Sequence, residues 1–170
     1  MTNIDDIRTQ LQQEGISSLS VSALAETDLD AMQWAGNELH LKTVARQIRS
    51  DHDGDTLAVR ARDGTVLAKG YIDHEVSETE SDIGQLATHP KLQSMGIGRV
   101  LMNAAESCIR ARNKKVAVLG VETINVRAKA LYDRLGYVPR HTEKQGWDSV
   151  DKDGKTFYYE TDVLIMSKEL

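Results

Sequence analysis

Apolar and polar positions recur along the chain with two different periods, which predict a mixture of helices and strands. Apolar residues spaced three and four apart predict a short helix over residues 4–13. A strict alternation with serines predicts a first strand over residues 19–23. Two further helical patterns follow, one over residues 27–35, where Thr27 is the expected N-cap, and one over residues 39–48.

The middle of the chain predicts a β-hairpin and then a further strand. Strand-like runs over residues 56–62 and 65–72 flank Asp63-Gly64, a dipeptide typical of the tight turns that join antiparallel strands. An acidic loop follows, and residues 82–88 form the next strand-like run. Pro90 is expected to end that strand, because proline cannot donate to a sheet ladder.

An amphipathic helix is expected over residues 96–112. Its apolar stripe is expected to face the core, while its polar residues face solvent. The stripe consists of Ile97, Val100, Leu101, Ala104, Ala105, Cys108 and Ile109, and the polar face carries Arg99, Asn103, Glu106 and Arg110.

The last third of the chain predicts strands around one helix. Residues 116–121 form an unbroken apolar run, which is typical of a strand buried on both faces. A helix is expected over residues 125–135, where Gly136 closes it, and a strand begins at Tyr137. The final strand is expected over residues 157–166. The predicted order β-α-α-β-β-β-α-β-α-β-β describes an α/β domain with a mixed sheet.

Composition restricts the class of protein. The chain has 170 residues, of which 40% are hydrophobic, enough for one core but short for two. We expect a helical extension over residues 1–17 and a single domain over residues 18–170. A net charge of −5 argues against a nucleic-acid partner, and the five histidines lack metal-ligand spacing, so no metal is expected.

Cellular location is predicted from cysteine usage and from the N-terminal residues. Cys108 is the single cysteine, which excludes an intrachain disulfide and fits a reducing compartment. The chain begins without the pattern of a signal peptide, and no apolar run approaches the roughly 20 residues that span a bilayer. A cytoplasmic protein with no membrane partner is expected.

The turn before the helix at residues 96–112 is the main candidate for ligand chemistry. Its sequence is Gln93-Ser94-Met95-Gly96-Ile97-Gly98, and it connects a strand to a helix N-terminus. Backbone N–H groups near residues 95–100 are therefore expected to hold a phosphate group at the positive end of the helix dipole. Leu101 stands where a dinucleotide fingerprint has its third glycine, and the Gly-Lys-Ser/Thr ending of a P-loop is absent.

A second motif lies about thirty residues downstream, Asn125-x-x-Ala128-x-x-Leu131-Tyr132-x-x-Leu135-Gly136-Tyr137. With the first motif and the predicted order of elements, it resembles the GCN5-related N-acetyltransferases (GNAT family) over roughly residues 18–170. The resemblance implies a mixed, mostly antiparallel sheet of six to seven strands flanked by helices. It also implies transfer of an acetyl group from acetyl-CoA to an amine by direct attack in a ternary complex.

The resemblance also assigns roles to individual residues. Main-chain groups of Leu86, Ala87 and Thr88 would pair with the pantetheine arm of acetyl-CoA, and Asn125 would contact that arm or brace its helix. The pyrophosphate would lie on Gln93, Ser94, Met95, Gly96, Ile97, Gly98, Arg99 and Val100.

Tyr132 matches the tyrosine that commonly acts as general acid in the family. Departing CoA is a thiolate whose thiol pKa is expected near the cysteine value of about 8.5, whereas tyrosine titrates near 10. Tyr132 is therefore protonated at neutral pH and can donate as the C–S bond breaks. The plain alternative is an aromatic side chain packed beneath the sheet.

The sequence offers several candidates for the general base. Many family members carry a glutamate on the strand before the pyrophosphate turn, where this chain has Gln85, and an amide cannot act as a base. Glu122 is the first substitute, followed by Asp82 and His89, and a base acting through water is equally admissible. Trp34 and Trp147 are candidates for lining an acceptor pocket or for packing.

The acceptor is predicted only by class. Five acids between Asp73 and Asp82 favour a small cationic amine such as a polyamine, an amino sugar or a lysine-like amine. Acetylation of a protein N-terminus or lysine is the related alternative, and a non-catalytic acyl-CoA-binding or sensing module is the alternative from another class. Family resemblance also suggests a possible homodimer, for which the Tyr158-Tyr159 region is a candidate surface.

Overall fold

A seven-stranded mixed sheet forms the centre of the computed structural model, which describes residues 3–170. The strand order is β1-β2-β3-β4-β5-β7-β6, and β4 with β5 is the one parallel pair among the strand pairs of these residues. This arrangement confirms the predicted fold class. The strands are β1 (Ser20–Ala23), β2 (Gly54–Arg60), β3 (Val66–Asp73), β4 (Glu80–Thr88), β5 (Val116–Glu122), β6 (Val138–Val150) and β7 (Thr156–Glu169). The α-helices are α1 (Ile4–Glu14), α2 (Glu38–Arg49), α3 (Ile97–Ala111) and α4 (Val126–Arg134).

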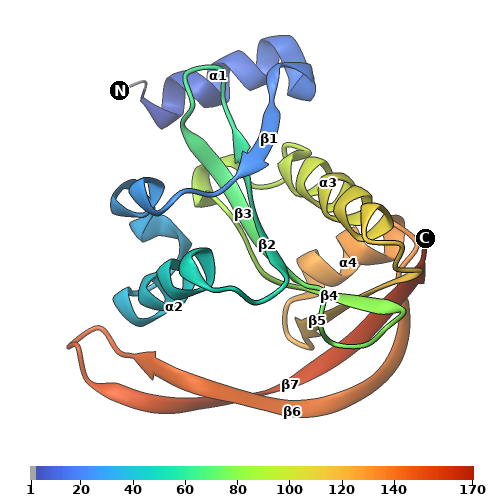
Figure 1. Cartoon of the computed structure of the whole chain (residues 1–170). Coiled ribbons are helices and arrows are strands. Elements are labelled where there is room, and N and C mark those ends of the chain that lie inside the picture. Colours follow the sequence, from blue (N-terminus) through green and yellow to red (C-terminus); the bar gives the residue numbers. More distant parts are fainter. Residues whose placement is uncertain (1–2) are drawn as a thin grey trace.

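Helices cover both faces of the sheet (Figure 1). On one face, α3 lies along the central strands and shares the main hydrophobic cluster with α1 and α4. On the other face, α2 packs with two short 3₁₀ turns, η2 (Glu26–Ala31) and η3 (Gln33–Ala35), over a smaller cluster that includes Ala58 and Val44. Strands β6 and β7 form a long curved hairpin that extends past the rest of the sheet.

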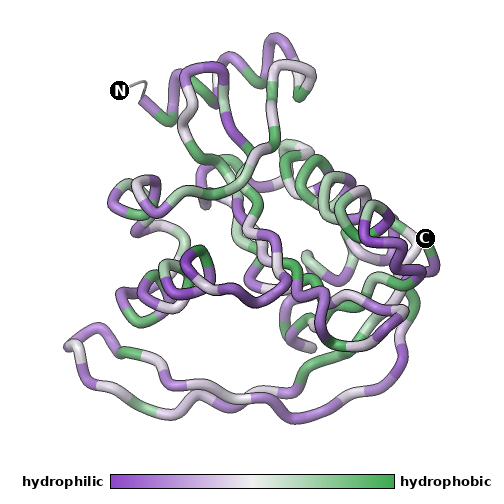
Figure 2. The backbone as a smooth tube through the Cα atoms, viewed as in Figure 1, coloured by the Kyte–Doolittle hydropathy of each residue, from purple (hydrophilic) through white to green (hydrophobic). Residues whose placement is uncertain are grey.

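The main cluster is built by the apolar stripe predicted for α3. Figure 2 shows hydrophobic residues recurring along α3, whereas the distal part of the β6–β7 hairpin is mostly polar. Ile97, Leu101 and Ile109 are almost fully buried there, and Ile7 and Leu11 of α1 join them. The N-terminal helix therefore contributes to the same core as the rest of the chain.

The helix expected over residues 27–35 is wrong, because 3₁₀ turns occupy this segment. Leu29, Met32 and Ala35 are spaced by three residues, and the Met32 N–H and the Ala35 N–H each donate to the carbonyl three residues earlier. A spacing of three matches the 3₁₀ period of 3.0 residues rather than 3.6. The predicted N-cap is also wrong: Ala25, not Thr27, is the N-cap residue, and its N–H donates to the Asp28 carboxylate at 2.8 Å.

The orientation predicted for Glu106 is also wrong. Its side chain is buried and accepts from Lys168 Nζ at 2.9 Å and from the Tyr137 hydroxyl at 3.2 Å. A carboxylate is buried here because a lysine and a tyrosine from outside α3 satisfy its oxygens.

The prediction that strand β5 is buried on both faces is wrong, because only one of its faces is buried. Ala117, Leu119 and Val121 are buried against the α3 side, while Gly120 on the opposite face is exposed. The unbroken apolar run does not imply burial on both faces here, because Val116 and Val118, on the same face as Gly120, are only partly covered.

Pro90 lies just after the end of β4, as predicted, and it begins a short 3₁₀ turn, η4 (Pro90–Leu92). Within residues 3–170, no helix combines the length and the apolar character needed to cross a membrane.

Candidate active site

The candidate site lies where the two parallel strands of the sheet separate. Strand β4 pairs with β5 only from Glu80 to Ile83, although both strands continue beyond that point. On its other side, β4 stays paired with β3 as far as Thr88. Among the strands of residues 3–170, none pairs with the edge of β4 that faces β5 from Gly84 to Thr88, so the main-chain groups of this edge can pair with an extended ligand.

A pocket of about 490 Å³ opens at this separation. It lies between the end of β4, the start of α3 and one face of α4. Most of the residues predicted to bind the cofactor line it: Leu86, Ala87, Thr88, Gln93, Ser94, Gly96, Ile97, Gly98, Arg99, Asn125 and Tyr132. Met95 and Val100 instead place their side chains against the core, and Glu122 lies outside the lining.

The turn before α3 has the conformation of an anion-binding site. Ser94 and Gly96 have φ values of 65° and 87°, so the chain turns sharply as the helix begins. The N–H of Val100 is bonded to the Gly96 carbonyl, which leaves the N–H groups of the three preceding helical residues without a helical acceptor. These donors and the positive end of the helix dipole favour a phosphate group.

Helix α4 closes the pocket on the other side, and it approaches α3 closely. A Cβ atom at Gly98 would lie 3.1 Å from the Leu131 side chain, so a glycine permits this approach. Arg127 and Arg134 also line the pocket, together with Arg99. Arg127 and Arg134 were not among the predicted site residues, although their separation by seven residues, two helical turns, places them on the same helix face as Leu131.

Asn125 and Tyr132 occupy the two ends of α4. The Asn125 side chain accepts the N–H of Ala128 at 3.2 Å and so caps the helix, one of its two predicted roles. Tyr132 is 6% exposed, and burial raises its pKa to about 12. Its ring packs edge-on against Tyr137, with ring centroids 6.1 Å apart. The Tyr132 hydroxyl is therefore protonated at any physiological pH.

The three candidate bases have different surroundings. Burial, and secondarily the charge of Asp73, raises the pKa of Asp82 to about 6. The Glu122 carboxylate accepts the Tyr159 hydroxyl at 2.7 Å. His89 has a pKa lowered by burial and by Lys91. With its raised pKa of about 6, Asp82 is largely ionised at pH 7.

Two aromatic contacts involve the tryptophans considered for the acceptor pocket. Trp34 lines the pocket, and its ring centroid lies 5.3 Å from that of His89. Trp147 lies on the β6–β7 hairpin, 5.1 Å from the ring of Tyr159. Through Tyr159, Trp147 is linked to Glu122.

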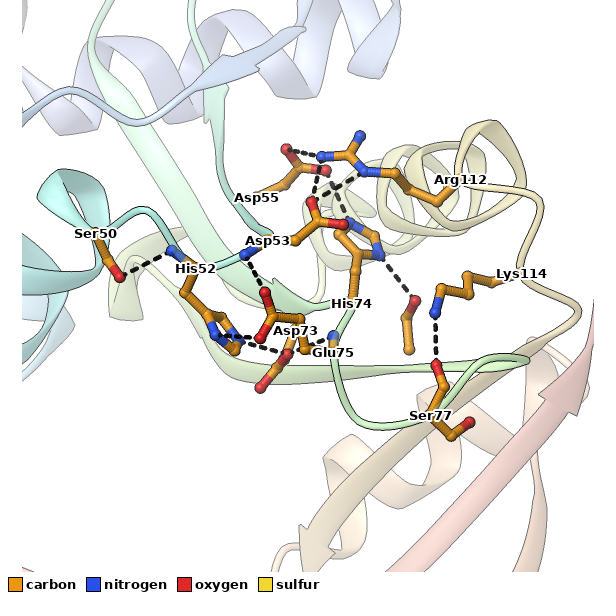
Figure 3. Close-up of polar contacts among 11 residues, drawn as sticks. Ser50, His52, Asp53, Asp55, Asp73, His74, Glu75, Ser77, Arg112 and Lys114 are labelled. Atoms are coloured by element: carbon orange, nitrogen blue, oxygen red, sulfur yellow. Dashed lines mark hydrogen bonds and ion pairs between the residues drawn. The ribbon is translucent and has the colours of Figure 1, made fainter.

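Three of the five acids between Asp73 and Asp82 are held by basic partners, and Figure 3 shows two of them, Asp73 and Glu75, beside His52. Asp73 and Glu75 both bind His52, at 2.7 and 3.0 Å, and Glu80 pairs with Arg140 at 2.6 Å. Asp82 has no ion pair within the described part of the chain. Among the described residues, half-buried Asp82 and exposed Glu78 are therefore the acids of this segment left available to a cationic acceptor.

In the same region, the side chains of a serine, a histidine and an aspartate are connected by hydrogen bonds. His74 contacts Ser81 Oγ at 2.8 Å and Asp55 at 2.9 Å (Figure 3). Ser81 is 0% exposed, so no substrate can reach its hydroxyl. This arrangement ties the strands together and is not a nucleophilic site.

Comparison with known proteins agrees with this geometry. Residues 18–137 match the model of the acetyltransferase (GNAT) family. A curated relative, mycothiol acetyltransferase from Beutenbergia cavernae, is 36% identical over 77 residues, which is 45% of this chain and 26% of the relative. The chain thus matches about a quarter of the length of that relative.

Solved structures share the fold. The ribosomal-protein-S18-alanine N-acetyltransferase from Escherichia coli has a TM-score of 0.68 at 22% identity, covering 89% of this chain and 93% of that one. A spermidine/spermine N-acetyltransferase from Vibrio cholerae has a TM-score of 0.68 at 18% identity, covering 90% and 93%. The IAA acetyltransferase from Bacillus cereus has a TM-score of 0.69 at 16% identity, covering 90% and 100%.

Proposed function

The chain belongs to the acetyltransferase (GNAT) family, and we propose that it moves an acetyl group from acetyl-CoA to a primary amine of a small cationic acceptor. The transfer would occur by direct attack in a ternary complex. The observation that carries this proposal is the pocket itself, in which an unpaired strand edge and a helix N-terminus face each other. An extended pantetheine arm suits the strand edge, and a pyrophosphate suits the helix N-terminus.

The donor would be held mainly by main-chain groups. Leu86, Ala87 and Thr88 would pair with the pantetheine amides, and the turn from Gln93 through the first helical residues to Val100 would hold the pyrophosphate. Arg127 and Arg134, both exposed at the pocket, would add charge-assisted hydrogen bonds to phosphate oxygens.

Tyr132 would serve as general acid. Tyr132 lines the pocket, and its raised pKa keeps the proton on the hydroxyl oxygen until negative charge develops on the departing sulfur. A proton or a hydrogen bond from this group would stabilise the thiolate as it leaves. Such a group typically contributes roughly 10²–10⁴-fold to rate.

Asp82 is our preferred base among the three candidates. It lies on β4, two residues before Gly84 and at the last positions where β4 pairs with β5. A Cβ atom added at Gly84 would meet only the Asp82 carboxylate, at 3.5 Å, so space is open beside that carboxylate. With a pKa of about 6, Asp82 is largely ionised at pH 7 and can accept a proton from the acceptor ammonium, directly or through water.

Glu122 would then bind the acceptor rather than deprotonate it. It is half-buried, it is held by Tyr159, and it has no ion pair within residues 3–170. A carboxylate bound to the Tyr159 hydroxyl, with the Tyr159 ring packed on Trp147, suits a second positive charge on the acceptor. This combination supports a small amine that carries more than one ammonium group.

A homodimer remains part of the proposal. Strand β6 is an edge strand, and the β6–β7 hairpin exposes Trp147, Phe157 and Tyr158. Large exposed apolar side chains on a free edge are typical of association surfaces. Sedimentation of the wild-type protein and of a Tyr158→Lys variant tests this part independently of activity.

Thiol release from acetyl-CoA against a panel of acceptors tests the activity. The panel contains diamines and polyamines, amino sugars, lysine analogues and peptides with free N-termini. We expect turnover with a small polycationic amine and none without an acceptor. Turnover of peptides alone would favour the protein-acetylating alternative, and acetyl-CoA binding without turnover of any acceptor would favour a sensing module.

Acetyl-pantetheine, which lacks the nucleotide phosphates, gives a matched control for the donor site. The Arg127→Gln and Arg134→Gln variants should weaken binding of acetyl-CoA several-fold and leave the weak binding of acetyl-pantetheine unchanged. Equal effects on both donors would contradict the proposed phosphate contacts.

A further inference from the structure

Lys69 is a buried ammonium without a carboxylate partner. Its side chain, on β3, is 2% exposed, and no ion pair of residues 3–170 involves it. Burial lowers its pKa to about 8, so it is still mostly protonated at pH 7. Its charge also contributes to the low pKa of His40 on α2, which burial and Lys69 together bring to about 4. Lysines are almost never fully buried unless they are paired, so this position needs an explanation.

Within the described part of the chain, the ammonium has one hydrogen-bond partner, the main-chain carbonyl of Gln85. Lys69 Nζ donates to that oxygen at 2.9 Å. Gln85 itself is in the left-handed region, with φ of 53°, a conformation that costs free energy for a residue with a side chain. Its side-chain Oε1 is buried and has no hydrogen-bond partner among residues 3–170. The lysine thus binds the most strained residue of β4.

Gln85 is strained because it forms a β-bulge. Tyr71 is paired with Gly84 and Lys69 with Ala87, so two residues of β4, Gln85 and Leu86, lie opposite the single residue Gly70. A Cβ atom at Gly70 would lie 2.9 Å from the Leu86 side chain, which shows how tightly the bulge is packed.

The bulge sets the register of the strand edge that faces the pocket. Side chains on a strand alternate between faces, so loss of one extra residue would turn the following residues to the opposite face. Those residues are Leu86, Ala87 and Thr88, which line the pocket. An ammonium that holds the carbonyl of the bulge therefore acts on the donor site without touching it.

We propose that Lys69 is a positioning residue for the donor: its buried ammonium holds the Gln85 carbonyl and fixes the bulge that presents the main chain of residues 86–88 to acetyl-CoA. The inference rests on the proposed function. A positioning role for Lys69 and a purely structural role predict different effects of removing the lysine on stability. A buried, unpaired charge does not stabilise the fold, so its removal should impair binding without lowering stability.

The test replaces Lys69 with methionine, which has a similar length and no charge. The Lys69→Met protein should bind acetyl-CoA about tenfold more weakly in calorimetric titration, which corresponds to about 1.4 kcal/mol. Its melting temperature at pH 7 should be equal to or above that of wild type. The matched control is Lys168→Met, which removes a lysine paired with buried Glu106. That control should melt at a lower temperature and bind acetyl-CoA as wild type does.

Repeating Lys69→Met in a Gln85→Gly variant tests whether Lys69 acts on acetyl-CoA binding through the bulge. Gln85→Gly places at this position the residue that adopts positive φ without steric cost. The effect of Lys69→Met on acetyl-CoA affinity should therefore be smaller in the Gln85→Gly background, a coupling that a double-mutant cycle measures. An equal effect in both backgrounds would overturn the proposal.

Each remaining outcome is decisive as well. Unchanged acetyl-CoA affinity in a folded Lys69→Met protein refutes the positioning role and leaves the proposed function intact. A wild-type protein that binds no acetyl-CoA overturns both. Failure of Lys69→Met to fold in either background would make Lys69 a structural residue and would also overturn the proposal.

Discussion

Replacing Asp82 with asparagine is expected to stabilise the fold at neutral pH while removing the proposed base. Asp82 lies half-buried on β4, and its pKa is raised from 3.8 to about 6, mainly by burial and then by the charge of Asp73. Asparagine has nearly the same shape and no charge to desolvate. The variant therefore separates the cost of burying this carboxylate from its proposed use in catalysis.

The magnitude follows from the pKa of Asp82, which is raised from 3.8 to about 6. At 1.36 kcal/mol per unit, the ionised form is disfavoured in the folded protein by about 3 kcal/mol. The folded state holds this proton more tightly than the unfolded state, so between pH 3.8 and 6 it binds more protons. Stability consequently falls as pH rises through this window, and the full cost is present above pH 6.

Urea unfolding of both proteins between pH 4 and pH 8 measures this cost. The two proteins should be about equally stable at pH 4, and Asp82→Asn should be more stable by up to about 3 kcal/mol at pH 8. Thiol release should fall by roughly 10²–10⁴-fold, as for the loss of a general base. Asp73→Asn is the matched control, and it should move the acidic limb of the wild-type pH–rate profile to lower pH. A stability difference that does not change with pH would refute the assignment of the raised pKa to Asp82.

Three further substitutions test other parts of the site and core. Tyr132→Phe should lower kcat roughly 10²–10⁴-fold, with acetyl-CoA affinity changed less than threefold, as measured by thiol release and calorimetry. Gly98→Val should weaken acetyl-CoA binding at least tenfold, because even a Cβ atom lies 3.1 Å from Leu131; binding equal to wild type would contradict the close approach. Lys168→Met should lower the free energy of unfolding by roughly 3 kcal/mol in urea titrations, because it leaves the Glu106 carboxylate buried without its ammonium partner.

Local signals in the sequence were sufficient for most of the fold. Asp63-Gly64 and Pro90 mark chain reversal and strand termination through their own backbone chemistry, so neighbours far away in the sequence are not needed to interpret them. Glu106 could not be predicted in the same way. Its partners Lys168 and Tyr137 are 62 and 31 residues away, and only the folded chain brings them to α3.

The residues of the candidate site also fall into those predicted from local sequence and those that depend on contacts with distant parts of the chain. The turn from Gln93 to Gly98 is contiguous, and its glycines and position before a helix were enough to propose phosphate binding. Asp82 was only a secondary candidate, because its burial depends on contacts outside its own strand. Lys69 in a strand-like run gave no sign of burial, since its environment includes α2 and the bulge of β4.

The three least favourable features around β4 have a common origin. A buried unpaired ammonium at Lys69, a left-handed Gln85 and a partly buried acid at Asp82 each cost stability, and sequence rules for a strand would avoid all three. Strand β4 must stay paired with β3 while it leaves β5, and a bulge allows this because it bends the strand within an intact ladder. Lys69 holds the bulge, and the separation it permits opens the space beside Asp82. Departures from local rules are expected where function requires them, so stabilising substitutions along this segment should reduce acetyl transfer.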